Sequence, residues 1–475
     1  MPYLLPILTI FLLPIYLLKI HLTPSISINL LELLLIYTLT IIYYAIFKQF
    51  SFQKIIRWSL PGQNKKIFLP ILLIVAGFTL SYLHHQQLTH WKDWTDGLGK
   101  LLDLIILPIL FGFAIHFLAI INIKGFFLKS KLDSPFLRLL QFFPPGMTLN
   151  VIYYFSVAIV AFLGIIFLIT GHLTFDHRLK IFFSSPNQLA MFLSPALIIG
   201  FSFIFSQFNR SAKESFKKFW LLYSSIFAII INIFFTKSLG SWLALSFVAL
   251  LLFAYYNVVK NPVFKKLIQF FQKYSLKIIA LIIILTTLAI FNVNQIITFT
   301  SYHPHTPPTS TDSRLAIYQV TRKIISQNRL WGIGPGSFQG EYLKEQQNFP
   351  AYPQWAVPHA HNNLLHFWAE GGILAFVGLI LIYISIFRVD DSRRVILANQ
   401  PFNQNKSETK TKSKNSKKEK LQQKKELPQL PFPQLTLLYF ILHGLIDTTI
   451  WTMPTAIFFW LTVIYYLTNQ PDLSD

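Results

Sequence analysis

The sequence has 475 residues, of which 53% are hydrophobic and 13% charged, with a mean hydropathy of +0.50. Soluble globular chains carry about 25% charged residues, so the composition argues against a soluble protein and predicts repeated membrane crossing. The absence of Cys excludes disulfides, thiolate zinc sites and iron–sulfur clusters. The net charge of +22 does not indicate nucleic-acid binding, because the basic residues lie mainly in short loops between apolar runs.

Twelve apolar runs are predicted to be membrane spans, because a bilayer core of about 30 Å needs about 20 helical residues. Pro108, Pro195 and Gly200 inside these runs do not argue against a span, since neighbouring helices satisfy the freed backbone groups. The first run lacks a basic segment and a small-residue cleavage site, so it is expected to be retained. The predicted spans are residues 3–20, 28–47, 67–84, 101–121, 149–171, 187–206, 219–236, 240–258, 278–297, 367–387, 433–449 and 452–468.

The distribution of Lys and Arg indicates which side of the membrane each loop is on, because short cytoplasmic loops carry most basic residues. Assigning alternate loops to the cytoplasm places most of the 41 Lys and Arg there and both termini inside. The predicted organisation is nine spans over 1–297, a large extracytoplasmic loop over 298–366, span ten over 367–387, a basic and partly disordered cytoplasmic loop over 388–432, and two spans with a cytoplasmic C-terminus over 433–475.

The cytoplasmic loop contains a low-complexity basic run over residues 404–426. A disordered, solvated segment is the favoured interpretation, because so polar and charged a run cannot build a core. Contact with anionic lipid headgroups is the alternative.

The extracytoplasmic loop begins with a predicted amphipathic helix over residues 313–329. Its apolar residues recur at helical spacing, and the opposite face carries cations that include Arg314. Such a helix either lies along the outer membrane surface or presents its cations to an anionic substrate.

Three glycines follow this helix, at Gly332, Gly334 and Gly336. Their likeness to a phosphate loop is superficial, because no strand precedes them, no Gly-Lys-Ser/Thr follows, and nucleotides are on the other side of the membrane. A tight turn whose backbone approaches neighbouring helices or a ligand is predicted instead.

Two histidines, His359 and His361, precede Asn362 and span ten. They are candidate metal ligands, but no H-E-x-x-H motif or third-ligand cluster accompanies them, so no metal is predicted. A polar interfacial loop bonded to itself is a further alternative. A functional histidine is favoured, since an ordinary histidine pKa of about 6.5 suits proton transfer near neutral pH.

Further polar residues lie at the outer ends of the predicted spans. Arg178 and Asn187 flank the mouth of span six, and Lys237 lies in the turn between spans seven and eight. His443 and Asp447 are four residues apart and are predicted to share one helix face, either facing the site or making an ordinary helix–helix contact. Together these cations and histidines predict an outward-facing cavity for a phosphate or pyrophosphate, because guanidinium groups bind phosphate oxygens in pairs.

In this order and spacing, the residues resemble the O-antigen ligase and polymerase superfamily of bacterial envelope enzymes. The resemblance extends from about the fifth span to the end of the chain, with matching topology before it. The matching positions are Arg178, Pro186, Asn187, Ala190, Gly332, Gly334, Phe338, His359, His361, Asn362, Glu370, Gly371, Gly372, His443 and Asp447.

The resemblance implies an all-α, GT-C-like polytopic glycosyltransferase with about 12 transmembrane helices. Such enzymes work in the bacterial cytoplasmic (inner) membrane. At its outer face they transfer a glycan from undecaprenyl pyrophosphate to a lipid, glycan or protein acceptor. The resemblance implies no metal, no cofactor and no nucleic acid, with membrane lipids as surroundings.

The resemblance also implies roles for individual residues. His361 would activate the acceptor hydroxyl, and Arg178 and Arg314 would bind the pyrophosphate and stabilise its charge as it leaves. Substrate-binding roles would fall to His359, Asn362, Lys237, Asn187, Gly332, Gly334, Asp447 and His443. One departure is Leu239, where family members often carry Arg; Lys237 is expected to replace it without the paired hydrogen bonds.

Three alternatives to a ligase stay open. A polysaccharide polymerase of the same superfamily differs only in its acceptor. A transporter or flippase for lipid-linked glycans should carry ionisable residues at mid-bilayer in several spans, whereas most predicted spans here are uncharged. A non-catalytic assembly protein leaves the histidines and arginines unexplained.

Overall fold

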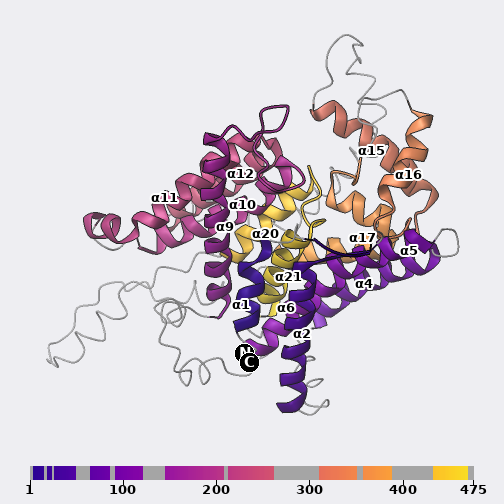
Figure 1. The fold of residues 1–475 in the computed structure, drawn as a ribbon, viewed down its shortest axis with the longest axis horizontal. Helices are drawn as coiled ribbons and strands as arrows, with labels where there is room; N and C mark the ends of the chain where they lie inside the picture. Colours follow the sequence, from indigo (N-terminus) through magenta and orange to yellow (C-terminus); the bar gives the residue numbers. More distant parts are fainter. Residues whose placement is uncertain are drawn as a thin grey trace, which may run out of the picture.

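A computed structural model describes residues 4–14, 19–23, 26–49, 65–85, 91–120, 145–207, 212–260, 310–349, 357–387 and 432–468. In these ranges the chain is almost entirely helical (Figure 1). The N-terminal part consists of α1 (Leu4–Phe11), strands β1 (Lys19–Thr23) and β2 (Ile26–Asn29), α2 (Leu30–Gln49), α4 (Lys65–His85), α5 (Trp91–Leu101), the π-helical turn η3 (Leu102–Ile106) and α6 (Leu107–Ile120).

The remaining helices carry the candidate site. They are α9 (Pro145–Ile169), α10 (Pro186–Gln207), α11 (Ala212–Thr236), α12 (Leu239–Lys260), α15 (Ser310–Gln327), α16 (Phe338–Glu345), the short 3-10 helix η4 (Gln346–Asn348), α17 (Asn363–Phe387), α20 (Phe432–Gly444) and α21 (Met453–Thr468). Pro145 and Pro186 occupy the first positions of α9 and α10, where a missing N–H costs no helical hydrogen bond.

Five apolar helical stretches in the described part of the chain are long enough to cross a membrane. They cover Ile67–His85, Asp96–His116, Leu149–Ile169, Pro186–Ile204 and Asn363–Ile386. This finding confirms a membrane protein with several spans, while the number twelve and the GT-C-like arrangement stay predictions. The predicted span 278–297 and the basic run 404–426 lie outside the described residues.

Four predicted spans differ clearly from the structure. The first helix ends at Phe11, and β1 pairs with β2 as antiparallel strands with Ile20 opposite Ile28, so residues 3–20 are not one continuous helix. Alternating polar and apolar residues on both sides of Pro24 favour these strands. The helix of the fourth span begins at Trp91 rather than at residue 101, and that of the seventh span begins at Ala212 rather than at residue 219. The helix of the eleventh span, α20, ends at Gly444 rather than at residue 449.

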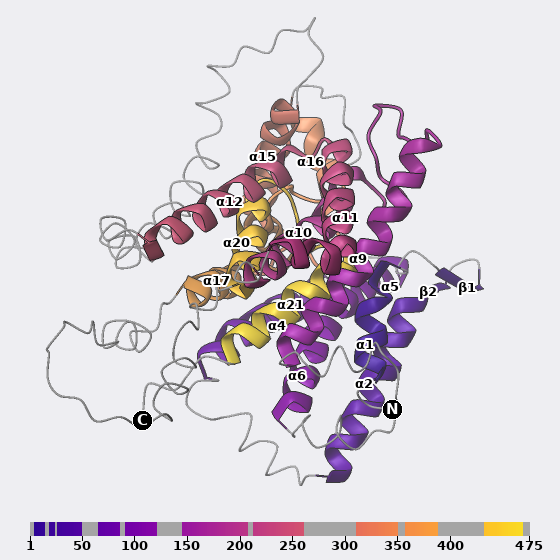
Figure 2. The same ribbon diagram turned by 90° about the vertical axis from the view of Figure 1, so that its left-hand side faces the viewer.

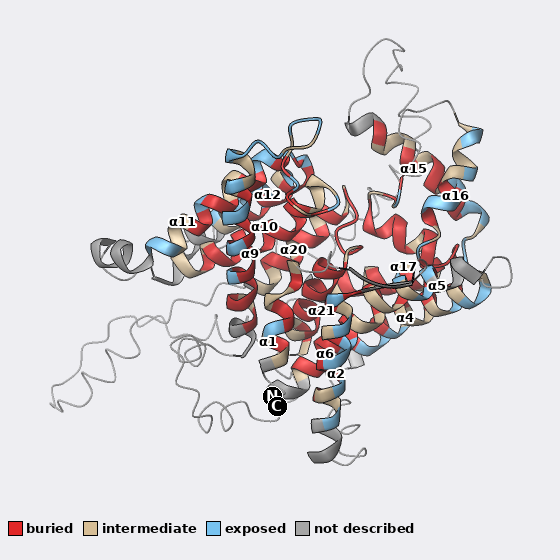
Figure 3. Ribbon diagram, viewed as in Figure 1, coloured by how far each residue is buried: buried red, intermediate tan, exposed pale blue. Residues whose placement is uncertain are grey.

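The main apolar core lies inside the helical bundle. Figure 3 shows buried residues concentrated on α10, α20 and α21. Large apolar side chains on α9, α11 and α12 face outward instead, among them Ile159, Phe227 and Phe247. An exposed apolar band of this kind is typical of lipid-facing helices.

The amphipathic helix predicted over 313–329 is confirmed as α15. Its apolar residues Ile317, Val320 and Ile324 are buried in a second cluster with α16 and the start of α17. The alternative in which this face lies on the membrane surface is therefore wrong. Figures 1 and 2 show α15 and α16 together at one end of the molecule.

Close packing between α4 and α17 fixes the helix that carries the site. A Cβ at Gly77 would lie 2.6 Å from the backbone nitrogen of Ala375, and one at Gly378 would lie 2.7 Å from the carbonyl oxygen of Pro70. Small residues allow such close approach between membrane helices. α17 is kinked at Gly372, where φ is 68° and a side chain would overlap the carbonyl of Leu330.

Candidate active site

The histidine pair lies in the loop that leads into α17. Asn362 caps this helix, because its Oδ1 accepts the backbone N–H of Leu365 at 3.0 Å. His361 adopts a left-handed conformation with φ of 49°, an uncommon state for a residue other than glycine. Tyr318 on α15 donates its hydroxyl to the carbonyl of His361 at 3.0 Å and so helps to hold this conformation.

Asp447 lies in the turn after α20, not on the helix itself. The prediction that His443 and Asp447 share a helix face is therefore wrong, because the helix ends at Gly444. Two hydrogen bonds continue the helical pattern beyond Gly444, from the backbone N–H of Leu445 to the carbonyl of Ile441 at 3.1 Å and from that of Asp447 to the carbonyl of His443 at 2.8 Å.

Hydrogen bonds join this turn to the histidine loop. Asn362 donates to the carbonyl of Leu445 at 2.9 Å. Asn363 donates to the Thr449 hydroxyl at 2.8 Å and accepts the Thr449 backbone N–H at 2.9 Å. The two segments, distant in sequence, therefore form one rigid unit.

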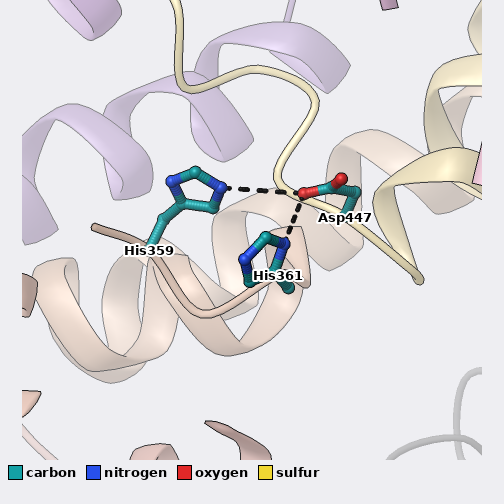
Figure 4. Close-up of side chains that lie close together, drawn as sticks. All are labelled: His359, His361 and Asp447. Carbon is teal, nitrogen blue, oxygen red and sulfur yellow. Dashed lines mark hydrogen bonds and ion pairs between the residues drawn. The ribbon is translucent and has the colours of Figure 1, made fainter. Parts of the chain in front are cut away.

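Asp447 lies against both histidines (Figure 4). Its Oδ1 is 2.8 Å from Nδ1 of His361 and 3.7 Å from Nε2 of His359. The Asp447 side chain is 1% exposed, whereas that of His361 is 22% exposed. The carboxylate also accepts the backbone N–H of Thr448 at 2.8 Å. A buried carboxylate that only accepts hydrogen bonds fits the ionised state.

The electrostatics agree with this geometry. Burial acts to raise the pKa of Asp447, but the charges and hydrogen bonds of His361 and His359 outweigh it and hold the pKa well below its usual range. Burial lowers the pKa of His359, and the neighbouring His361 lowers it further, while Asp447 acts in the opposite direction. A neutral His359 beside an ionised Asp447 follows from these shifts.

A chain of hydrogen bonds leads from Arg178 to His361. Nη2 of Arg178 donates to Oδ1 of Asn187 at 2.6 Å, and Nδ2 of Asn187 donates to Oδ2 of Asp447 at 2.9 Å. Because an arginine can only donate, the amide oxygen of Asn187 must face Arg178 and its nitrogen must face Asp447. Asn187 thus links the guanidinium to the carboxylate that contacts His361.

Arg314 approaches the same turn from α15. Its Nε donates to the carbonyl of Ile446, next to Asp447, at 2.9 Å. Burial lowers the pKa of Arg178, and Asp176 and Asp447 act against that shift while Arg314 adds to it. The structure therefore brings the two arginines and His361 together, as the sequence predicted.

Other predicted residues lie farther from this group. His443 is fully buried in α20, where its Nδ1 contacts the hydroxyl of Tyr439 at 2.7 Å. Lys237 donates to the carbonyl of Asp176 at 3.3 Å, and Asp176 lies on the same loop as Arg178. Leu239, where the family often has Arg, is 57% exposed at the start of α12.

The glycine turn packs against α17. Positive φ angles occur at Gly332, Gly334 and Gly336, which agrees with the predicted tight turn. The Glu370 carboxylate accepts the backbone N–H groups of Gly336 at 2.9 Å and Phe338 at 3.1 Å. The described contacts of Gly332 and Gly334 are with α17 and α4, so a substrate-binding role for them stays a prediction.

Sequence reasoning missed several residues around the histidines. The resemblance included Glu370 without giving it a function, and Tyr318 was not singled out. His366 was not singled out, although it is fully buried in α17 with neither ring nitrogen hydrogen-bonded. For Glu370 and His366 a chemical signal was available, because a polar side chain in the apolar segment of α17 needs a partner.

The three side chains in Figure 4 also offer a ligand set. His359, His361 and Asp447 each present one ligand atom, and these atoms lie within 4.8 Å of one another. The sequence interpretation that no third ligand accompanies the histidines is therefore wrong. Asp447 supplies the third ligand from a turn far along the chain.

Comparison with known families agrees with the resemblance seen in the sequence. Residues 224–380 match the family model described as O-antigen ligase, and this range includes Arg314, His359 and His361. Arg178 and Asp447 lie outside it. No curated protein matches the chain. Residues 224–380 are therefore similar to the O-antigen ligase family, which supports the resemblance seen in the sequence.

Proposed function

We propose that the protein is a metal-independent glycosyltransferase that transfers a glycan from undecaprenyl pyrophosphate to a lipid, glycan or protein acceptor. The reaction takes place at the outer face of the bacterial cytoplasmic membrane, with both termini in the cytoplasm. The observation that carries the proposal is the hydrogen bond between His361 and the buried Asp447, next to Arg178 and Arg314.

His361 is the proposed general base. Because ionised Asp447 only accepts, Nδ1 of His361 must donate to it, which leaves the lone pair of Nε2 for the acceptor hydroxyl. The hydroxyl oxygen attacks the anomeric carbon, its proton passes to Nε2, and the bond from that carbon to the pyrophosphate oxygen breaks. Attack opposite the leaving group inverts the anomeric carbon.

Arg178 and Arg314 are proposed to hold the pyrophosphate. Negative charge grows on its bridging oxygen as the bond breaks, and a fixed guanidinium stabilises this charge more than it stabilises the bound donor. Each arginine is anchored by a backbone carbonyl, Arg178 to Thr236 and Arg314 to Ile446. Anchoring at Nε fixes the orientation of the planar Arg314 guanidinium.

The test uses the purified full chain and a labelled oligosaccharide on undecaprenyl pyrophosphate. Transfer by the wild type should be lost on His361→Ala, by about 10²–10⁴-fold, the usual contribution of a general base. His172→Ala is the matched control, since this exposed histidine contacts only its own loop and helix end among the described residues. Wild-type transfer by a folded His361→Ala variant would remove the histidine from the mechanism.

Arg314→Lys tests the phosphate-binding role. Lysine keeps the charge but lacks the planar pair of donors, so transfer should fall by up to about 10²–10³-fold, the usual cost of one lost transition-state hydrogen bond. Unchanged transfer would show that Arg314 does not contact the donor.

The acceptor class is decided in the same assay. A polymerase extends the glycan when the labelled donor is the only substrate, whereas a ligase needs an added lipid A-core or protein acceptor. Donor that moves across a vesicle membrane without cleavage of its pyrophosphate bond would indicate a transporter instead.

A further inference from the structure

We propose that His359, His361 and Asp447 bind a zinc ion, and that this ion inhibits the transferase by changing the tautomer of His361. Zinc binding by itself is independent of the proposed function, whereas the inhibitory effect rests on it. The three ligand atoms already lie within 4.8 Å of one another.

The distances suit a tetrahedral ion after small side-chain movements. Zinc binds imidazole nitrogen and carboxylate oxygen at about 2.0–2.2 Å, which separates neighbouring ligand atoms by roughly 3.4 Å in a tetrahedron. The Oδ1 of Asp447 is 2.8 Å from Nδ1 of His361 and 3.7 Å from Nε2 of His359. These separations bracket the value that zinc needs.

The donor set favours zinc over the common hard cations. Magnesium and calcium take oxygen ligands, and only one of the three side chains provides oxygen. Two imidazoles and one carboxylate match the three-ligand sets of open zinc sites, in which the fourth position is left for another molecule.

The surroundings orient the ligands before an ion arrives. Asn187 donates to Oδ2 of Asp447, so Oδ1 is the oxygen directed to the histidines. Tyr318 holds the backbone of His361 through its carbonyl. Such outer hydrogen bonds are typical of metal sites. Arg178 and Arg314 oppose a cation, so zinc should bind here more weakly than in a structural zinc site.

Zinc at this place changes which nitrogen of His361 carries the proton. Without zinc, Nδ1 carries the proton and donates it to Asp447, so Nε2 has a free lone pair. With zinc bound to Nδ1, a neutral imidazole carries its proton on Nε2. Nε2 then donates and cannot accept a proton from the acceptor hydroxyl.

Binding is tested on the purified full chain, stripped of metal and titrated with zinc against a chromophoric chelator. One equivalent should be bound by the wild type and by His172→Ala, and lost in His359→Ala and in Asp447→Asn. X-ray absorption at the zinc edge should show imidazole ligands in the wild type. Equal zinc binding by all four proteins, or none by the wild type, overturns the site and leaves the proposed function untouched.

Inhibition is tested by measuring glycan transfer at saturating zinc. Transfer should fall on the order of 100-fold, the contribution expected of a general base, and should recover when a chelator is added. Zinc bound by the triad without loss of transfer would contradict the role of His361 as base. Transfer that requires zinc and stops with chelator would overturn inhibition and make the ion a cofactor.

Discussion

Two buried carboxylates on the two sides of the histidine loop have different environments. Glu370, in α17, is 0% exposed and accepts two backbone N–H groups from the glycine turn. Asp447 is also buried, but two of its partners are the side chains of Asn187 and His361. His361 is itself 22% exposed, so a side chain that contacts Asp447 directly reaches solvent.

This difference fits a structural role for Glu370 and the role proposed above for Asp447. Backbone donors are fixed by the turn to which they belong, so the two hydrogen bonds of Glu370 hold that turn against α17. Side-chain donors can exchange partners when a substrate arrives, so Asp447 can orient a base and respond to a ligand. We expect substitutions at Glu370 to affect stability first and substitutions at Asp447 to affect transfer first.

Asp447→Asn should give the largest effect on transfer without unfolding the protein. The nitrogen of the new amide would face either Nδ2 of Asn187 or Nδ1 of His361, and both of these atoms are donors. Either arrangement breaks the chain of hydrogen bonds that leads from Arg178 to His361. Glycan transfer by the purified variant should fall by about 10²–10⁴-fold. Thermal unfolding of the same sample should show a smaller change than any Glu370 variant, and the reverse order would contradict the comparison.

Glu370→Gln should give the largest loss of stability. One of its two terminal atoms becomes a donor, which leaves the backbone N–H of exposed Gly336 or of buried Phe338 facing another donor. A buried unsatisfied group costs about 1–3 kcal/mol, which denaturant unfolding of the purified variant would detect. Glu341→Gln on the neighbouring α16 is the control, because Glu341 pairs only with exposed Lys344 among the described contacts of its carboxylate.

Tyr318→Phe should have the smallest effect and sharpens the comparison. It removes only the hydrogen bond to the carbonyl of His361, at a cost of about 0.5–1.5 kcal/mol, and keeps the ring in the second apolar cluster. Transfer should fall by less than in Asp447→Asn, since the contact of Nδ1 with Asp447 is retained. A loss equal to that of Asp447→Asn would show that the backbone conformation of His361, not its tautomer, limits the reaction.

Much of the helical framework could be predicted, because long apolar runs leave few alternatives in a membrane. The α9, α10 and α17 helices begin and end close to the predicted bounds. The α15 helix was predictable from its apolar spacing, and the convergence of Arg178, Arg314 and His361 from their order in the family motifs.

The partners inside the site could not be read from local patterns. Asp447 is 86 residues from His361 and 260 from Asn187 in the sequence, so only tertiary packing decides that they meet. Helical spacing gave His443 as its neighbour, although Gly444 marks a plausible helix end. The hairpin at residues 19–29 was missed because apolar length was given more weight than alternation.

The bonds between the loop before α17 and the turn after α20 have a consequence for biosynthesis. Helices enter the membrane in chain order, and Asp447 belongs to the last hairpin, α20 and α21. A chain that ends after Arg178, Arg314 and His361 but before residue 447 therefore lacks the carboxylate that contacts His361. On the proposed mechanism, such a truncated chain would have no oriented base.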